Sequence, residues 1–522
     1  MIEREKNGRG NVEIVSIDEM VPKDHLLRKI DVAVDFRRIY KIVESLYCAD
    51  NGRPGVDPVV LFKIVLLQHI YGIPSLRQTL RDVQMNIAYR WFLGYGLTEA
   101  VPHFATVSYA FTRRFGEEII AQVFAWILEE IMKAGYLTPE VVFVDATHVK
   151  ASANLHKSEK KQVARTARAY ENQLRKEVNE IRESEGKKPF DDDPGAGNET
   201  TREITASTTD PDCGLFHKGE HRKCFAYGVH TACDGQNYIL DAEVTAGNIH
   251  DSIVFDTLYE RLVEKHPDAD TIVMDAGYKT PWICKRILDD KRTPSLPYKR
   301  PMTKKGNLPW YEYVYDEYYD QIICPTYHLL DYTTTTKEGK RTYKSHPEDC
   351  RDCPELARCT QSKECRKVME RHIWQRYLDE AEDIRHTPLG KATYAHRKET
   401  IERVFADAKE KHGMRFTHHR GLGAVSKWVK MKYAAMNLKK FALHKAISCL
   451  FSHLALFRQN FPLSIRYVEP RFVKRRIGVQ HIGYKGTNFA GIMPHRKKDK
   501  KTPCAGRISS GSSPHISSSP IC

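Results

Sequence analysis

The sequence lacks the long apolar segment that a membrane-spanning helix requires. Such a helix needs about 20 consecutive apolar residues, and the longest candidate, near 441–457, is interrupted by His444 and Lys445. The first twenty residues mix charged and apolar positions and show no apolar core of a secretion signal. We therefore expect a cytoplasmic protein without membrane contact.

Acidic residues are also in short supply relative to basic ones. The 82 Lys and Arg residues outnumber 67 Asp and Glu residues, which gives a formal net charge of +15 over 522 residues. This excess favours a polyanionic partner, most simply a nucleic acid, although solubility alone would also account for it. The apolar fraction of 41% excludes wholesale disorder, and the length suggests about three domains.

Cysteine is unevenly distributed. Of 13 cysteines, four fall between positions 350 and 365, in a chain without an export signal, so a metal site is favoured over disulfides. The pair Cys350 and Cys353 has the spacing of half a zinc site, which Cys359 and Cys365 would complete. Cys324 is a substitute ligand, and reduced, unligated cysteines are the alternative.

Residues 1–130 have a mainly helical pattern. A buried helix is expected from Pro58, a second begins at Ser75, and a third segment carries the basic residues Arg113 and Arg114. Two helices joined by a short glycine-containing turn form the DNA-reading helix-turn-helix in some proteins. An ordinary helical bundle would give the same pattern, so both interpretations stay open.

Two short apolar runs, 141–145 and 271–275, each end in an aspartate. A hairpin at 233–237 lies between them in the sequence. If the two runs form neighbouring central strands, Asp145 and Asp275 meet at one sheet edge, where their mutual repulsion invites a divalent cation. The alternative is that each aspartate caps its own turn.

A third carboxylate is expected on a helix over 398–411. Glu402 borders the apolar face of this helix, and Lys409 lies on the same side two turns later. Glu399 and Asp407 are rival carboxylates, and spacing alone does not choose among the three. A further helix, over 424–445, carries lysines that would contact DNA phosphate, among them Lys427 and Lys430, although an unliganded surface helix would look the same.

Several segments in chain order resemble bacterial insertion-sequence transposases of the DDE type. The first-aspartate motif is similar at 142–152, the second at 275–278 and the glutamate motif at 397–421. The resemblance covers about residues 10–450 and includes these further segments: 52–58, 71–75, 216–227 and 247–252. One departure is that Arg397 precedes Glu402 by five residues, where many relatives have four.

The resemblance implies an α/β fold, an RNase H-like mixed sheet flanked by helices, interrupted by insertions and preceded by an all-α domain. It assigns the following parts to the chain: 1–130, helical and DNA-binding; 138–300, first part of the catalytic core with a charged helical insertion at about 156–200; 301–395, a Tyr/Cys-rich insertion; 396–450, the final core helices; and 451–522, a basic, partly disordered tail.

The same resemblance implies that Asp145, Asp275 and Glu402 hold two Mg²⁺ ions, with Mn²⁺ as a substitute. The enzyme would cut the ends of its element and join them to target DNA, with Lys409 and Arg397 contacting the substrate. Its partners would be double-stranded DNA (terminal inverted repeats and target) and at least a second copy of the chain, at the bacterial nucleoid. A DNA-binding descendant without catalysis, and a nuclease that does not join strands, are the alternatives.

Three more residues are conceivable metal ligands near these motifs, namely His148, His250 and Asp251. Histidine is more often a structural or phosphate-contacting residue than a ligand of a hard cation such as Mg²⁺. We therefore expect none of the three to be a primary ligand.

Overall fold

The computed structural model describes most of the chain up to the end of its longest helix. The described residues are 14–48, 55–164, 170–190, 201–218, 222–299, 303 and 305–460. Within them, no helix has both the length and the apolar character needed to cross a bilayer. The tail expected from residue 451 starts inside a helix that continues to Asn460, and the rest of it lies outside the described residues.

Helices form the N-terminal part, as the sequence predicts. They are α1 (Ile17–Met20), α2 (Leu26–Ala33), α3 (Arg38–Val43), α4 (Pro58–Ile70), α5 (Leu76–Met85), α6 (Ile87–Leu93), α7 (Phe104–Tyr109) and α8 (Glu117–Lys133). Asp57 begins α4 by accepting a 2.7 Å hydrogen bond from the Val59 amide. Because α3, α5, α6 and the C-terminal helix surround α4, its apolar residues are buried on nearly every face.

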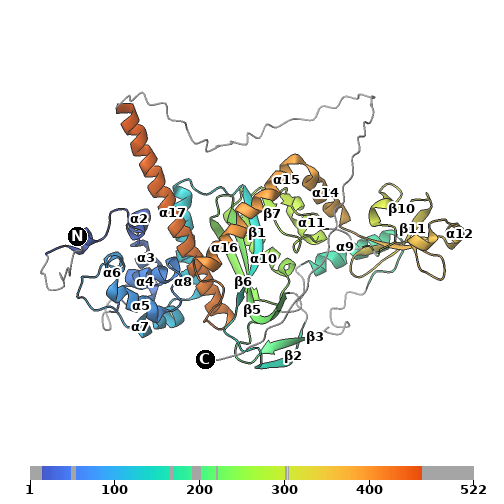
Figure 1. The fold of residues 1–522 in the computed structure, drawn as a ribbon. Helices are drawn as coiled ribbons and strands as arrows, with labels where there is room; N and C mark the ends of the chain where they lie inside the picture. Colours follow the sequence, from blue (N-terminus) through green and yellow to red (C-terminus); the bar gives the residue numbers. More distant parts are fainter. Residues whose placement is uncertain are drawn as a thin grey trace, which may run out of the picture. The chain divides into compact units, whose positions relative to one another are not determined.

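A mixed sheet lies at the centre of the described chain (Figure 1). Its strands are β1 (Val141–Lys150), β4 (Gly214–Lys218), β5 (Arg222–Asp234), β6 (Ile239–Ala246), β7 (Thr271–Val273) and β8 (Thr293–Ser295). Strand β5 pairs antiparallel with β1 on one side and with β6 and β4 on the other, whereas β1, β7 and β8 run parallel. This order, β6-β5-β1-β7-β8, confirms the RNase H-like α/β fold.

Helices cover both faces of this sheet. One face packs against α10 (Asp251–Lys265), α11 (Pro281–Asp289) and α14 (Gln375–His386), and shares a core with Val142 and Val144 of β1. The other face packs against α16 (Ile401–Glu410), α17 (Leu422–Asn460) and the N-terminal helices, in a core that includes Phe143. Successive side chains of a strand point to opposite faces, so Asp145 projects with Phe143 toward α16 and α17.

Two expectations about the chain between the aspartate motifs are wrong. Strand β1 does not end at Asp145 but continues to Lys150, because its pairing with β5 extends to Ala226. The charged insertion is not helical throughout, since β2 (Ser158–Ala164) pairs with β3 (Thr201–Ser207), whose β-branched residues favour a strand. Its helical part is α9 (Glu171–Ser184).

The Tyr/Cys-rich insertion folds around a small antiparallel sheet, which the sequence pattern did not indicate. Its order is β13-β12-β11-β10-β9. The elements are β9 (Val314–Asp316), β10 (Gln321–Ile323), β11 (Leu329–Thr335), β12 (Lys340–Ser345), α12 (Pro347–Arg351), α13 (Leu356–Cys359) and β13 (Val368–His372). A separate core that includes Tyr343 and Ile322 holds it together. Helix α15 (Pro388–Ala395) then leads back to α16.

Candidate active site

The parallel pairing of β1 and β7 determines how the two aspartates are arranged. Val141 pairs with Thr271 and Phe143 with Val273. The same register, carried two residues further, brings Asp275 alongside Asp145. The Asp275 carboxylate accepts a 2.7 Å hydrogen bond from the Gly277 amide, which fixes it at the turn after β7. The condition set by the sequence analysis, that the two runs form neighbouring strands, is therefore met.

Arg397 joins the first aspartate to the glutamate. Its guanidinium lies 2.5 Å from the Asp145 carboxylate and 3.6 Å from the Glu402 carboxylate. The Arg397 and Asp145 side chains are 12% and 16% exposed, whereas Glu402 is 51% exposed. Of the three rival carboxylates, Glu402 alone shares an ion-pairing partner with Asp145. The Glu399 carboxylate faces His396 at 4.0 Å, and the Asp407 carboxylate pairs with Lys411 at 2.8 Å.

The additional residue between Arg397 and Glu402 is accommodated by a break in the helix. A 3₁₀ turn, η4 (His396–Glu399), precedes α16, and Thr400 between them has φ −111° and ψ −100°, outside the helical region. The buried Thr400 hydroxyl donates to the carbonyls of His396 and Arg397 and so satisfies backbone groups that the break frees. Arg397 therefore reaches both carboxylates despite its unusual spacing.

Several negative charges act on Asp145. Burial raises the pKa of this carboxyl to about 6, the Arg397 guanidinium opposes that shift, and Asp275 and Asp251 reinforce it. Burial and then the charge of Asp275 also raise the pKa of Asp251. A Cβ added at Gly277 would lie 3.0 Å from the Asp275 carboxylate and 3.3 Å from that of Asp251, so both carboxylates border the same glycine.

The donor chemistry of this cluster suits Mg²⁺, which prefers a few carboxylate oxygens. The raised pKa of Asp145 means that its charge lacks full compensation even beside Arg397. Within the described ranges, however, no three His, Cys, Asp or Glu side chains are grouped closely enough to hold a metal ion. Arg397 lies between Asp145 and Glu402, and these carboxylates would have to rearrange around it to share a cation.

Of the three other conceivable metal ligands, His148 and His250 have structural contacts, whereas Asp251 lies in the group of carboxylates around Asp145 and Asp275. His148 stacks on Phe216 with ring centroids 3.6 Å apart, and His250 caps α10 by accepting from the Ser252 amide. Asp251 lies 3.8 Å from His230, a buried residue of β5 whose pKa burial lowers to about 4. Sequence spacing gave no signal for His230, because β5 brings it to the site from a distant segment.

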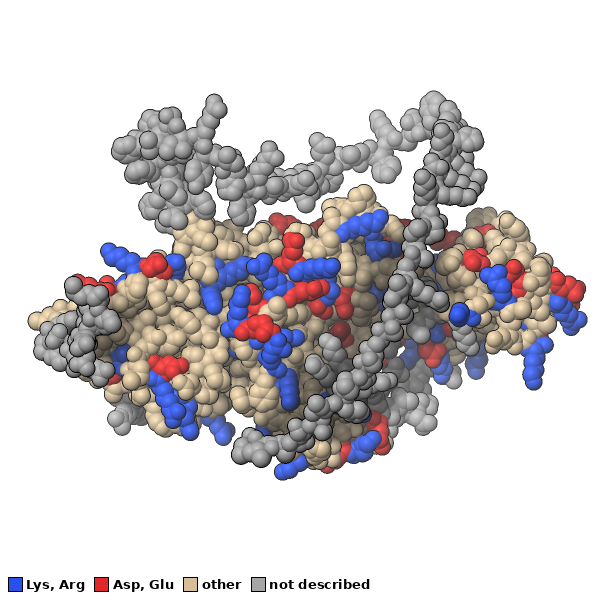
Figure 2. All heavy atoms as spheres, in the orientation of Figure 1, with Lys and Arg blue, Asp and Glu red and all other residues tan. Residues whose placement is uncertain are grey.

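A basic cavity of about 400 Å³ borders Glu402. Its cationic lining residues are Arg385, Lys391, Arg397 and Lys398. Figure 2 shows Lys and Arg side chains gathered with acidic ones over α16 and the adjoining part of α17. The sequence had indicated Arg397 in this region but not Arg385 or Lys391, which lie on helices without a recognisable motif.

The other basic residues expected to bind DNA have diverse surroundings. Arg113 is exposed at the end of η2 (Ala110–Arg114), whereas the Arg114 guanidinium lies 4.7 Å from the Tyr47 ring centroid. The Lys427 ammonium donates to the Phe111 and Phe115 carbonyls. Lys430 is half-buried on α17, and Lys409 lines a second, larger cavity.

The cysteines of the insertion surround a small cavity of about 20 Å³, enough for one water-sized guest. Four cysteines line it, namely Cys324, Cys350, Cys353 and Cys359. Cys365, the expected fourth ligand, is not among the lining residues, and Cys324 on the turn after β10 is there in its stead. Hydroxyl groups contact the thiols, with the Tyr313 hydroxyl 3.1 Å from the Cys359 sulfur. Structural zinc at these cysteines stays a prediction.

Comparison with known proteins agrees with this arrangement. Residues 15–113 match the family model of a transposase domain (DUF772), and residues 323–442 match that of a transposase DDE domain. The second match includes Glu402 and the four cysteines that line the small cavity. No curated protein matches the chain significantly. The two matches, one to each end of the described chain, support its assignment to the DDE transposases of insertion sequences.

Proposed function

We propose that this transposase cuts DNA at the ends of its element and joins the freed ends to a target strand, in a reaction that depends on a divalent metal. The proposal is supported by the β1–β7 register, which brings Asp275 alongside Asp145, and by Arg397, which forms ion pairs with both Asp145 and Glu402. The basic cavity beside Glu402 supports DNA as the substrate, since phosphate oxygens are bound by Lys and Arg.

Both steps are in-line displacements at phosphorus. In cleavage, a water oxygen forms the new bond to phosphorus and the 3′-oxygen of the neighbouring nucleotide leaves with the bonding electrons. In joining, that 3′-hydroxyl attacks a phosphate of the target strand, and the target's own 3′-oxygen leaves. Asp145, Asp275 and Glu402 would hold two Mg²⁺ ions, which when bound supply Lewis acidity at the attacking and leaving oxygens.

The protein's own side chains prepare this site. Arg397 holds Asp145 and Glu402 toward each other before substrate arrives, and limits their repulsion. Arg385, Lys391 and Lys398 line the wall of the adjoining cavity and would bind the phosphates that flank the reacting one. Because the two ends of an element are cut and joined together, the active assembly would contain at least two copies of the chain.

The experiment that tests this proposal uses the purified full-length protein and the DNA that flanks its coding region. Reactions with Mg²⁺ and with EDTA are mapped for 3′-hydroxyl ends and for joined product. We expect Mg²⁺-dependent cuts at inverted repeats that Glu402→Gln abolishes. Glu399→Gln is the matched control, because Glu399 lies three residues away on the same segment and its carboxylate faces His396 at 4.0 Å.

Each alternative function predicts a different result. Cuts without joined product would indicate a nuclease, and binding of the ends without cuts would indicate a DNA-binding descendant that has lost catalysis. Loss of cleavage in both Glu402→Gln and Glu399→Gln would remove the argument for Glu402. Cleavage that persists unchanged in Asp145→Asn would contradict the whole assignment.

A further inference from the structure

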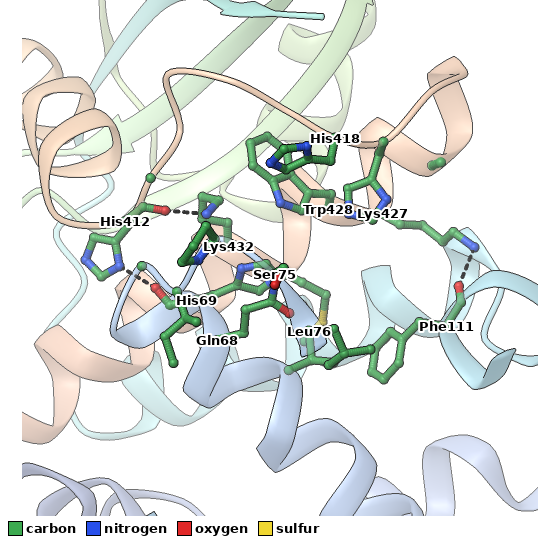
Figure 3. A pocket seen from close by; sticks show the side chains of 18 of the residues that line it. Gln68, His69, Ser75, Leu76, Phe111, His412, His418, Lys427, Trp428 and Lys432 are labelled. Atoms are coloured by element: carbon green, nitrogen blue, oxygen red, sulfur yellow. Dashed lines mark hydrogen bonds between the residues drawn. The ribbon is translucent and has the colours of Figure 1, made fainter. Parts of the chain in front are cut away.

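A second cavity, of about 910 Å³, lies between the N-terminal helices and the α16–α17 segment. The end of α4, the start of α5, η2, the loop after α16 and the first turns of α17 all contribute to it (Figure 3). Its volume falls in the range of about 300–1,000 Å³ that is typical of small-molecule sites. None of the three carboxylates of the candidate active site lines it, so it is a distinct feature.

The lining of this second cavity is basic. It includes Lys409, Arg415, Lys427 and Lys432, and Glu117 is the one carboxylate among its lining residues. The Glu117 carboxylate lies against Gly423 in the first turn of α17. Such an excess of positive charge favours an anionic guest.

Lys432 is the most unusual of these cations. Its side chain is 4% exposed, and within the described chain no carboxylate forms an ion pair with it. Its ammonium donates to the His412 carbonyl and lies 4.6 Å from the ring centroid of Trp428 (Figure 3). Burial lowers the pKa of this lysine to about 7. A buried cation without an anion is costly, and a bound phosphate would supply the missing charge.

Histidines beside Lys432 do not compete for that anion. His69 is buried, and its pKa is lowered well below the ordinary value by burial and by the charge of Lys432. Burial lowers the pKa of His412 to about 4, and its ring bonds the His69 carbonyl at 2.8 Å. Both rings are therefore neutral near pH 7, and they leave Lys432 as the buried charge at this wall.

The rest of the lining is mixed, and part of it is apolar or aromatic. This part includes Trp428, Leu76 and Phe111, which Figure 3 labels. Nucleic-acid bases stack on such rings irrespective of sequence. Cations beside aromatic rings, in a cavity of this size, match the phosphate and the base of one nucleotide.

Helix α16 connects this cavity to the candidate active site. It carries Glu402 in its first turn and Lys409 in its last, and seven residues of helix span about 10 Å along the axis. That distance equals about three steps along one strand of B-form DNA. A nucleotide in the cavity could therefore belong to the same strand as the phosphate at Glu402.

We propose that the cavity binds one unpaired nucleotide of the substrate DNA, with its phosphate at Lys432 and Lys427 and its base on Trp428. A base within the duplex stack cannot enter a cavity of the size of one nucleotide, which is why the nucleotide must be unpaired or turned out of the helix. The inference rests on the proposed function, because it takes DNA as the substrate. A free nucleotide offers the same chemistry, and the experiment distinguishes the two sources.

The test measures binding of full-length protein to labelled DNA in EDTA, where no cleavage occurs. The probes are a 20-base-pair duplex with a four-thymidine 3′ overhang, the same duplex with blunt ends, and unlabelled thymidine monophosphate as competitor. We expect the overhang duplex to bind at least about fivefold more tightly than the blunt one, the lower end of what one base–aromatic stack contributes.

Variants locate that preference within the molecule. Trp428→Leu and Lys432→Met should bring the ratio of overhang to blunt binding close to one, whereas Trp428→Phe, which keeps an aromatic ring, should retain most of it. Lys430→Met is the matched control, since Lys430 is on the same helix but does not line the cavity. It should weaken both duplexes equally and leave the ratio unchanged.

Two results would overturn the inference. One is that Trp428→Leu and Lys432→Met leave the ratio of overhang to blunt binding at its wild-type value, although thermal unfolding shows that each variant is folded. The other is displacement of the overhang duplex by thymidine monophosphate at an equal concentration, which would assign the cavity to a free nucleotide. Because this assay needs no catalysis, its failure and the failure of Mg²⁺-dependent cleavage are separate outcomes.

Discussion

Replacing Lys432 by methionine should stabilise the protein while it removes the preference for unpaired DNA. The pKa of this lysine falls from 10.5 to about 7 because burial disfavours its charged form. At about 1.4 kcal/mol per pKa unit, the charged lysine costs the folded state about 5 kcal/mol. Lys432→Met also loses the hydrogen bond to the His412 carbonyl, which should cancel about 1–3 kcal/mol of the stabilisation. We expect a net gain of about 2–4 kcal/mol at pH 7.

The pH dependence of this gain follows from the direction of the shift. Between about pH 7 and 10.5 the unfolded chain keeps the Lys432 proton and the folded chain has lost it. The stability of the wild type therefore rises with pH through this window. Methionine does not titrate, so the advantage of Lys432→Met should be largest at or below pH 7 and should disappear toward pH 10.5.

Urea unfolding of the wild type and Lys432→Met at pH 6, 8 and 10 measures this difference directly. Lys430→Met serves again as the control and should change the unfolding free energy by no more than about 0.5 kcal/mol. A destabilised Lys432→Met, or a difference between it and the wild type that does not vary with pH, would refute the view that Lys432 is a buried, uncompensated charge. That result would also weaken the case for an anion in the cavity.

Three further predictions concern the carboxylates and the cysteines. Gly277→Ala should reduce cleavage without unfolding the protein, measured by initial rates, because the added methyl would lie 3.0 Å from the Asp275 carboxylate; an unchanged rate would show that this turn tolerates movement. Arg397→Gln should strengthen Mg²⁺ binding roughly tenfold, because the substitution removes a cation that competes for Asp145. Thermal-shift titration with Mg²⁺ measures this affinity, and weaker binding would mean that Arg397 organises the metal ligands. Protein purified without chelator should contain about one zinc per chain, retained in Cys365→Ser and lost in Cys324→Ser. Zinc that is lost in Cys365→Ser but retained in Cys324→Ser would instead make Cys365 the fourth ligand.

The sequence alone predicted the parts of the site that lie in short, local patterns. The two apolar runs that lead to Asp145 and Asp275 indicated central strands, and their parallel register bears this out. The helix that carries Glu402 was evident from its apolar face. Spacing could not choose among Glu402, Glu399 and Asp407; the resemblance selected Glu402, and the shared ion pair with Arg397 agrees with it.

Other features depended on contacts between distant segments. Strand β1 continues beyond Asp145 because β5 provides a pairing partner, which no local pattern encodes. Cys324 approaches Cys350 only through the fold of the insertion, since 25 residues separate them in the sequence. The break at Thr400 lets Arg397 reach both carboxylates. Its role could not be predicted from the sequence, because Asp145 is brought to Arg397 by a distant strand.

The sequence by itself thus determined the helical character of the N-terminal part, the two apolar runs that lead to Asp145 and Asp275, and the basic character of the chain. Only the tertiary structure decided that Lys432 is buried beside Trp428, in a cavity to which α4, α5, η2 and α17 all contribute. The physical reason is that hydrophobic periodicity reports which face of a helix is buried, but not which helix covers it. A cavity and an uncompensated charge exist only where such faces meet.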